Sequence, residues 1–187
     1  YSIEYGEAAF YGPKLDFMVK DSLNRKWQLG TIQVDYQLPE RFKLEYITEN
    51  NDKNTPVVIH RAPFGSLERF VALLTEHCYG NFPFWLAPIQ ITILSISDKF
   101  NTYSEKVFES LSKLNLRVIK DLRSEKISKK IRDAELKKIP YMIIIGENEL
   151  KSKKISLRKH TEGDLGVMTL DHLISTLRKE KNVIINN

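Results

Sequence analysis

The sequence HRAPFGSLERF at residues 60–70 marks a change from a strand to a helix. Residues 56–60 favour a short strand. Gly65 and Ser66 then open a helix, with Ser66 suited to the N-cap and Gly80 just past the C-terminal end. The apolar positions of that helix follow the spacing i, i+3, i+4, i+7 and i+11: Leu67, Phe70, Val71, Leu74 and Cys78.

Upstream of this stretch, the sequence predicts an antiparallel hairpin. Between residues 14 and 20, apolar and charged side chains alternate with a period of two, which is typical of a half-buried strand. Residues 21–25 favour a turn, and residues 27–35 favour the returning partner strand. The first half of the chain is therefore expected to form an antiparallel sheet closed by a helix.

The second half alternates strands and helices in the order β-α-β-α-β-β-α. Residues 141–145 are apolar on both faces, as expected for a central strand covered by helices on both sides. Thr102 and Glu105 have the spacing of a capping box at a helix start. The pattern predicts a three-layer α/β domain with a largely parallel sheet. The predicted strands are 90–97, 117–122, 141–145 and 154–158, and the predicted helices are 102–114, 127–138 and one that begins at Thr169.

Residues 80–88 interrupt both periodicities and contain two prolines, Pro83 and Pro88. We place the domain junction there. The predicted organisation is a first domain over residues 1–80, a hinge over residues 81–88 and a second domain over residues 89–187.

Composition excludes some classes of protein. Of the 187 residues, 42% are hydrophobic and 28% are charged, as in an ordinary globular protein. No apolar run approaches the ~18 residues that a membrane span needs, so no membrane partner is expected. The single cysteine, Cys78, cannot form an internal disulfide, which favours a reducing cytoplasm.

The net charge of +5 is uneven along the chain. Residues 1–88 hold 9 lysines and arginines against 11 acidic residues, whereas residues 89–187 hold 20 against 13. Such asymmetry indicates nucleic-acid binding by the second half, with Lys129 and Lys130 expected as peripheral lysines. A solvated lysine-rich surface would give the same counts, so charge alone leaves both interpretations open.

Arg69 is at odds with its predicted position. With Ser66 as the N-cap, Arg69 lies in the first helical turn, where the helix dipole disfavours a cation. A cation there is better tolerated when an anion lies in front of it, and a guanidinium binds phosphate through a planar pair of donors. An exposed arginine, tolerated at a small cost in stability, is the alternative.

Residues 60–70 resemble motif 3 of the class II aminoacyl-tRNA synthetases, a strand that enters a helix with an ATP-binding arginine. Within that class, the chain resembles the threonyl-tRNA synthetases, and the resemblance covers nearly the whole chain. The similar segments are FYGPKLDF (10–17), WQLGTIQVD (27–35), PER (39–41), HRAPFGSLERF (60–70), WLAP (85–88), DLRSEK (121–126), KIPYM (138–142) and GDLG (163–166).

The resemblance implies catalytic roles for Lys14 and Arg69, with Arg69 on the ATP phosphates. It further implies a set of residues that line the threonine, adenylate and ATP pocket: Tyr11, Gln28, Thr31, Gln33 and Ser66. Gln33 and Thr31 share one face of their strand, and Gln33 is expected to contact the amino acid. In a regular strand Gln28 points to the other face, where it is expected to contact the nucleotide.

His60 resembles the last of three zinc ligands, which are one cysteine and two histidines in this family. An apolar pocket separates threonine poorly from the isosteric valine, whereas zinc that binds the amino group and hydroxyl of threonine can reject valine. Three protein ligands with open positions fit such a site. The other two ligands are not in this sequence. Mg²⁺ is expected to accompany ATP.

In the second half, the resemblance implies an anticodon-binding domain that reads splayed bases by stacking and hydrogen bonding. Glu149 and Arg158 match residues that contact anticodon bases, and Arg132 and Lys138 match neighbouring polar contacts. Ser124 stands where the family usually has asparagine, so one base contact would be shorter or water-mediated.

The resemblance also implies the reaction and its partners. The parent enzyme would be a homodimer that activates threonine with ATP and transfers it to tRNA(Thr). The dimer-forming first motif and the arginine-bearing second motif of class II enzymes are not in this sequence. The chain is therefore expected to be a C-terminal fragment that is inactive alone.

Two alternatives compete with this interpretation. A prolyl, histidyl or glycyl sibling would share the second domain, but His60 within its motif argues against it. A non-catalytic paralogue that binds nucleic acid would keep the fold while losing active-site residues, whereas Lys14, Gln33, His60 and Arg69 are all retained.

Overall fold

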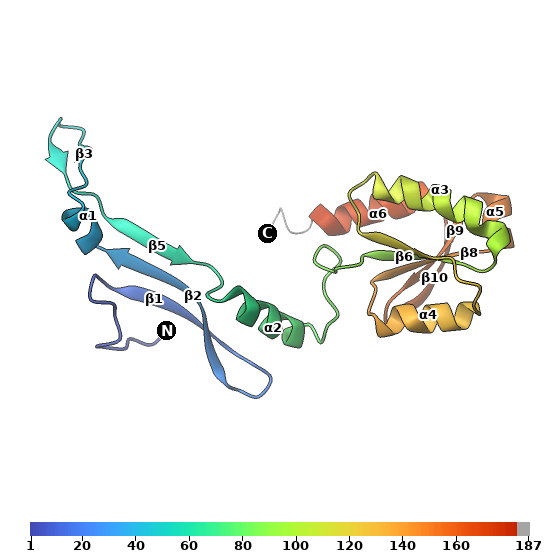
Figure 1. The fold of residues 1–187 in the computed structure, drawn as a ribbon, viewed down its shortest axis with the longest axis horizontal. Coiled ribbons are helices and arrows are strands. Elements are labelled where there is room, and N and C mark those ends of the chain that lie inside the picture. Colours follow the sequence, from blue (N-terminus) through green and yellow to red (C-terminus); the bar gives the residue numbers. More distant parts are fainter. Residues whose placement is uncertain (183–187) are drawn as a thin grey trace. The chain divides into compact units, whose positions relative to one another are not determined.

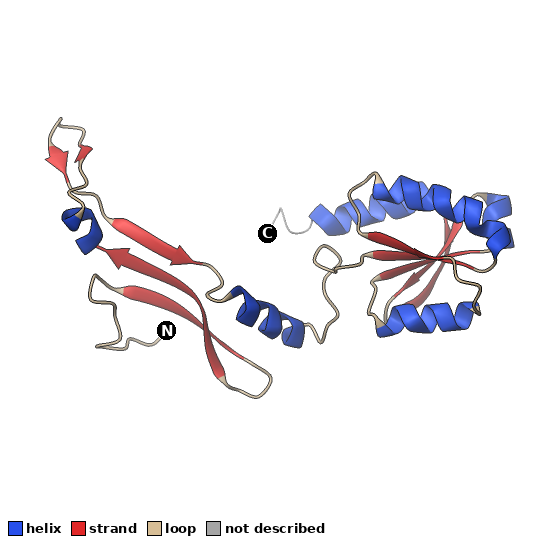
Figure 2. Ribbon diagram, viewed as in Figure 1, coloured by secondary structure: helices blue, strands red, loops and turns tan. Residues whose placement is uncertain are grey.

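The computed structural model describes residues 1–182, and the chain divides into two compact units after Cys78. The first unit is built mainly on an antiparallel sheet, and the second is an α/β domain (Figures 1 and 2). Within residues 1–182, no helix combines the length and the apolar character that a membrane crossing requires.

The first unit confirms the predicted hairpin, the short strand after it and the helix that follows Ser66. Its elements are β1 (Lys14–Lys20), β2 (Lys26–Asp35), α1 (Gln37–Arg41), β3 (Tyr46–Ile47), β4 (Lys53–Asn54), β5 (Val58–Ala62) and α2 (Leu67–His77). The strands β1, β2 and β5 form one antiparallel sheet in that order, and β3 pairs with β4 (Figure 1).

Asp21 closes the turn between β1 and β2. Its buried carboxylate accepts hydrogen bonds from the backbone N–H groups of Leu23 and Arg25, both at 2.9 Å. Asn24 takes a φ of 61°, a conformation that asparagine tolerates better than most residues. The turn predicted over residues 21–25 is confirmed.

The polar side of β1 is the more buried of its two sides. Leu15 and Phe17 are 55% and 51% exposed, whereas Lys14 and Asp16 on the opposite side are half-buried. The two polar side chains pair with each other at 2.9 Å and shield one another, while the apolar side stays open in the described part of the chain. Alternating polarity therefore locates this strand but does not identify which of its faces is covered.

The second unit is a five-stranded sheet between helices. Its elements are β6 (Ile91–Ser95), the 3-10 helix η1 (Asp98–Phe100), α3 (Asn101–Ser112), β7 (Val118–Asp121), α4 (Ile127–Leu136), β8 (Tyr141–Ile145), α5 (Glu147–Ser152), β9 (Ile155–Lys159), β10 (Gly163–Met168) and α6 (Leu170–Asn182). The strand order is β10-β9-β8-β6-β7. Helices α3 and α6 cover one face and α4 covers the other (Figure 1). The predicted three-layer α/β architecture is confirmed.

The central strand β8 lies between two apolar cores. On one side, Ile143 and Ile145 pack with Leu111 of α3 and Leu173 of α6. On the other side, Met142 belongs to a smaller core under α4. An apolar run on both faces is the expected signature of such a strand.

The sheet is mixed rather than largely parallel. The strands β6, β7 and β8 run parallel, but β9 and β10 run antiparallel beside β8. The sequence does not predict β10, because Gly163 and Gly166, both with positive φ, interrupt its alternation of polarity. It does not predict α5 either, because six residues are too few to show a helical period.

The capping box predicted at Thr102 and Glu105 does not form. The short helix η1 runs directly into α3, which places Thr102 inside the helix rather than at its end. The N-cap is Phe100, which makes no side-chain capping bond. The preceding 3-10 turn, which local spacing does not reveal, displaces the helix start.

The predicted hinge packs within the second unit. Phe84 is buried, and its ring meets the Tyr141 ring edge-on with centroids 5.6 Å apart. Gln90 Nε2 donates to Phe84 O at 2.8 Å, and Arg117 Nε donates to Ala87 O at 2.8 Å. These bonds attach the segment to the strands that follow it, while the domain limits at residues 80 and 89 stay a prediction.

Lys130 is buried, which corrects the expectation of a peripheral lysine. Its side chain is 1% exposed, and Nζ donates to Ser95 O at 2.7 Å and to Asp121 O at 3.2 Å. These carbonyls end β6 and β7, so the ammonium joins two carboxyl-terminal strand ends. Asp121 Oδ1, 4.0 Å away, balances the charge. Lys129, in contrast, is exposed and pairs with Glu125.

Replacing Lys130 with alanine is expected to destabilise the second unit by about 2–4 kcal/mol, because two buried carbonyls lose their donor and a cavity remains. Lys129→Ala is the matched control and should change the free energy of unfolding by less than about 0.5 kcal/mol. Urea unfolding followed by circular dichroism measures both. Equal free energies for the two variants would contradict the structural role of Lys130.

Candidate functional site

Three strands of the first unit align Lys14, Gln33 and His60 in one row. The β1–β2 pairing sets Lys14 opposite Gln33, and the β2–β5 pairing sets Gln33 opposite His60. Directly opposed residues of antiparallel strands point to the same face. The register therefore brings together three predicted site residues that are far apart in the sequence.

Tyr11, in the segment before β1, joins this row. Its hydroxyl donates to Gln33 Oε1 at 2.6 Å, and its ring meets the His60 ring edge-on, with centroids 5.9 Å apart. Tyr11, Gln33 and His60 line a cavity of about 390 Å³. The rest of its lining is Phe10, Asp35, Gln37, Leu38 and Arg41.

Asp35 lies against His60, and the sequence analysis does not single it out. Its buried Oδ2 lies 2.9 Å from His60 Nε2, and Oδ1 accepts from the N–H groups of Gln37 and Leu38. Burial acts to raise the pKa of Asp35, but the hydrogen bonds from His60 and the backbone outweigh it, so the pKa lies below its ordinary value. Because Asp35 follows Gln33 by two residues, strand alternation alone already predicts that it shares this face.

A β-bulge brings Gln28 to the face of Thr31. Between the pairs Asp16–Thr31 and Met18–Gln28, β2 carries one more residue than β1. The extra residue reverses the alternation, and Gln28 Nε2 donates to Asp16 Oδ1 at 2.7 Å. The expectation that Gln28 points to the opposite face is therefore wrong, because it assumed a regular strand.

Lys14, Asp16 and Gln28 form a connected polar cluster on this face. The hydrogen bond with Asp16 raises the pKa of Lys14 above its ordinary value, so the ammonium is charged at neutral pH. Thr31, the residue opposite Asp16, adds a buried hydroxyl to the same face.

Arg69 lies in the first turn of α2, as predicted. Ser66 is the N-cap, and its Oγ accepts a hydrogen bond from the Arg69 N–H at 3.3 Å. The Arg69 guanidinium lies 5.2 Å from the centre of the Trp27 ring and donates to Gln28 O at 3.4 Å. The cation therefore reaches from the helix to β2.

His60 fits the role of one metal ligand in a larger set. Across residues 1–182, no group of three or more His, Cys, Asp or Glu side chains is arranged to hold a metal ion. Because Asp35 engages Nε2, the other ring nitrogen, Nδ1, is the one that can offer its lone pair to a metal. A carboxylate behind a ligating histidine is the usual arrangement in zinc sites.

In the second unit, Ser156 connects Glu149 to the strand of Arg158. Glu149 lies in the first turn of α5, where Oε2 accepts from the Gly146 N–H at 2.9 Å and Oε1 accepts from the Ser156 hydroxyl at 2.6 Å. Ser156 and Arg158 are two residues apart on β9 and so share a face. Arg158 Nε is buried without a hydrogen-bond partner in the described chain, and Glu135 Oε1 is 3.9 Å away.

The predicted anticodon residues lie at both edges of the sheet rather than together, with Glu149 after the end of β8 and Arg158 beside its start. Ser124 is exposed in the loop after β7, at the carboxyl edge of the parallel strands, and Arg132 is exposed on α4. Lys138 precedes β8 at the opposite edge, where its Nζ donates to Tyr79 O. Sequence analysis does not single out Ser156, whose hydroxyl donates to the Glu149 carboxylate.

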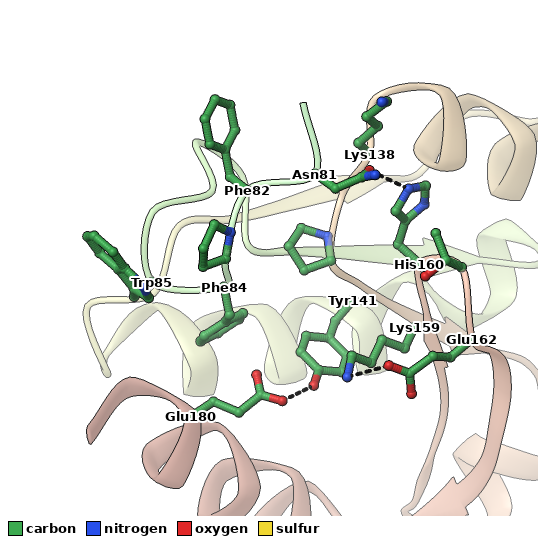
Figure 3. A pocket seen from close by; sticks show the side chains of 13 residues that line it. Asn81, Phe82, Phe84, Trp85, Lys138, Tyr141, Lys159, His160, Glu162 and Glu180 are labelled. Carbon is green, nitrogen blue, oxygen red and sulfur yellow. Dashed lines mark hydrogen bonds and ion pairs between the residues drawn. The ribbon is translucent and has the colours of Figure 1, made fainter. Parts of the chain in front are cut away.

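Lys138 instead lines a cavity of about 460 Å³ (Figure 3). The polar groups of this cavity largely satisfy one another. The Tyr141 hydroxyl donates to Glu180 Oε1 at 2.6 Å, and His160 Nε2 lies 2.9 Å from Asn81 Oδ1. The arrangement fits a packed end of the domain.

Both units match known families. Residues 2–78 match the tRNA synthetase class II core domain (G, H, P, S and T), and residues 90–180 match the anticodon binding domain. The chain is 58% identical to the threonine–tRNA ligase of Porphyromonas gingivalis and 59% identical to that of Phocaeicola vulgatus. Each alignment covers 98% of this chain and 28% of the relative.

A solved structure has the same fold. The crystal structure of the RNA binding domain of threonyl-tRNA synthetase from Cryptosporidium parvum Iowa II matches with a TM-score of 0.88 and 44% identity, over 94% of this chain and 44% of that chain. The chain spans 28% of the length of the curated relatives named above. Sequence motifs, family matches and fold agree: the chain belongs to the class II aminoacyl-tRNA synthetases and corresponds to the C-terminal region of the threonyl-tRNA synthetases.

Proposed function

We propose that the chain is the part of a threonine–tRNA ligase that completes the active site and reads the tRNA anticodon. The whole enzyme would activate threonine with ATP to threonyl-adenylate and transfer the threonyl group to the 3′ end of tRNA(Thr). The row of Lys14, Gln33 and His60 supports this proposal most strongly, because the strand register gathers the polar groups that such a site needs. A non-catalytic paralogue is not favoured, since Lys14, Gln33, His60 and Arg69 are all present.

In this proposal, the cavity beside Gln33 holds threonine. The Tyr11 hydroxyl donates to Gln33 Oε1, so the amide N–H₂ of Gln33 is the end that can donate to the amino acid. The buried Thr31 hydroxyl on the same face offers a further polar contact. The charged Lys14 lies where it can attract the substrate carboxylate or the adenylate phosphate.

Arg69 and the start of α2 would hold ATP. The guanidinium suits the phosphates, and the N-terminal turn capped by Ser66 adds the positive end of a helix dipole. Mg²⁺ would accompany the ATP phosphates. In activation, the threonine carboxylate attacks the α-phosphorus and pyrophosphate leaves. Catalysis then rests on positioning and on charge stabilisation by Lys14 and Arg69, without a protein nucleophile.

His60 would bind zinc through Nδ1, with Asp35 holding the ring by Nε2. When bound, zinc would supply a Lewis acid for the amino group and hydroxyl of threonine, which excludes valine because valine has no hydroxyl. The other ligands would come from the part of the enzyme that this chain does not include. For the same reason, we expect the chain to be inactive alone.

The second unit would bind tRNA(Thr) by its anticodon. The Glu149 carboxylate repels phosphates, so its partner would be a base edge that donates N–H groups, while Arg158 would donate to base acceptors. Each Glu149 oxygen already accepts one bond and retains a further lone pair. We further propose that the enzyme is a homodimer that acts in the cytoplasm.

Arg69→Ala in the intact enzyme should lower threonine-dependent ATP–pyrophosphate exchange at least about tenfold, because a charged contact with the phosphates is lost. Arg61→Ala is the matched control, since Arg61 is exposed and points to the opposite face from His60 on β5. It should leave exchange unchanged. Near-normal exchange by Arg69→Ala would remove Arg69 from the ATP site.

Arg158→Ala should weaken binding of cognate tRNA by about 1–3 kcal/mol and erase its margin over an anticodon-swapped tRNA, because a base contact is lost. Lys129→Ala should weaken both tRNAs equally and flatten the salt dependence of binding by about 0.7 in slope, because only a phosphate contact is lost. Filter binding across a salt series measures both effects. Equal binding of the two tRNAs by the wild type would disprove anticodon reading.

A further inference from the structure

Neutral groups hold the Arg69 guanidinium. It lies over Trp27 at 5.2 Å and donates to Gln28 O, and among the described residues it forms no ion pair with a carboxylate. The adjacent Glu68 is turned away, with its Oε2 accepting a hydrogen bond from the Ser66 hydroxyl at 2.8 Å. An arginine held in this way keeps its full charge for an anionic ligand.

Trp27 is itself anchored. Its indole Nε1 donates to Asp21 Oδ2 at 2.9 Å, and the same carboxylate accepts from the Leu23 and Arg25 N–H groups and from Arg25 Nε. These hydrogen bonds lower the pKa of the buried Asp21 to about 2, and the bond from Trp27 has the largest effect. Arg25 also lies 5.6 Å from the Trp27 ring, but Asp21 neutralises its charge.

We propose that Trp27 is a positioning residue for ATP binding: its indole, anchored on Asp21, orders the Arg69 guanidinium for the phosphates before the nucleotide arrives. The proposal rests on the proposed role of Arg69 in ATP binding. A long side chain at an exposed helix start otherwise samples many rotamers, and ordering it on binding costs affinity. An aromatic face attracts the guanidinium without neutralising it, whereas a carboxylate in the same place would compete with the phosphates.

Two consecutive residues of β2, next to its β-bulge, contact the Arg69 guanidinium. The bulge directs the Gln28 side chain to the polar cluster of Asp16, while the Gln28 carbonyl accepts from Arg69 Nη1. The neighbouring residue, Trp27, contributes its ring. A contiguous pair of residues thus contacts the cation through a backbone oxygen and an aromatic face.

Threonine-dependent pyrophosphate exchange by the intact enzyme tests the proposal. Trp27→Leu should raise the KM for ATP by about three- to tenfold, the size expected when a cation–π contact is lost, with the KM for threonine unchanged. Trp27→Phe keeps an aromatic face and should recover most of the ATP affinity. Arg61→Ala, at an exposed residue of β5 that touches neither Trp27 nor Asp21, is the matched control and should change the KM by less than about twofold.

The double variant separates positioning from a purely structural effect. In an Arg69→Ala background, Trp27→Leu should cause no further rise in the KM for ATP, because no guanidinium is left to position. An equal rise in that background, or no rise in the single variant, would overturn the proposal. If Arg69→Ala alone leaves the KM unchanged, the proposed role of Arg69 fails and the positioning role falls with it.

A second variant keeps the test decisive if Trp27→Leu does not fold. Asp21→Asn retains the indole ring but weakens its anchor, and it should raise the KM for ATP in the same direction. The rise should again disappear in the Arg69→Ala background. A rise that persists there would contradict positioning through Arg69.

Discussion

The register of three antiparallel strands is the constraint on which the proposed active site depends. β1, β2 and β5 each contribute one side chain to the row of Lys14, Gln33 and His60. A slip of one residue in either pairing would send one of them to the opposite face. The Tyr11–Gln33 hydrogen bond and the Asp35–His60 contact join neighbouring segments and favour this register.

Local sequence patterns predict much of the first unit. They do not predict the features that depend on contacts between strands. The N-cap Ser66 predicts the position of Arg69, because capping depends only on neighbouring residues. The face of Gln28 could not be predicted, because the bulge depends on contacts between distant segments. A Cβ on Gly30 would lie 2.9 Å from Pro63 O, so this close approach needs glycine, but no alternation of polarity records it.

In the second unit, too, local patterns predict the elements but not the contacts between distant segments. Residues 141–145 are apolar throughout, and the central strand is predicted correctly. Lys129 and Lys130 look alike in sequence, yet only Lys130 meets the ends of two parallel strands, which are distant in the chain. Likewise, the family resemblance names Glu149, but its hydrogen bond from the Ser156 hydroxyl depends on β9 lying beside α5, which local sequence does not reveal.

The zinc content of the protein tests most directly whether His60 supplies one ligand of a zinc site whose other ligands lie elsewhere in the enzyme. If His60 supplies one of three ligands, the intact enzyme should hold about one zinc per subunit and its His60→Ala variant much less. Isolated residues 1–187 should hold little zinc, because one ligand does not retain the metal. Elemental analysis after dialysis measures all three. Stoichiometric zinc in the isolated chain, or an undiminished content in His60→Ala, would contradict this site.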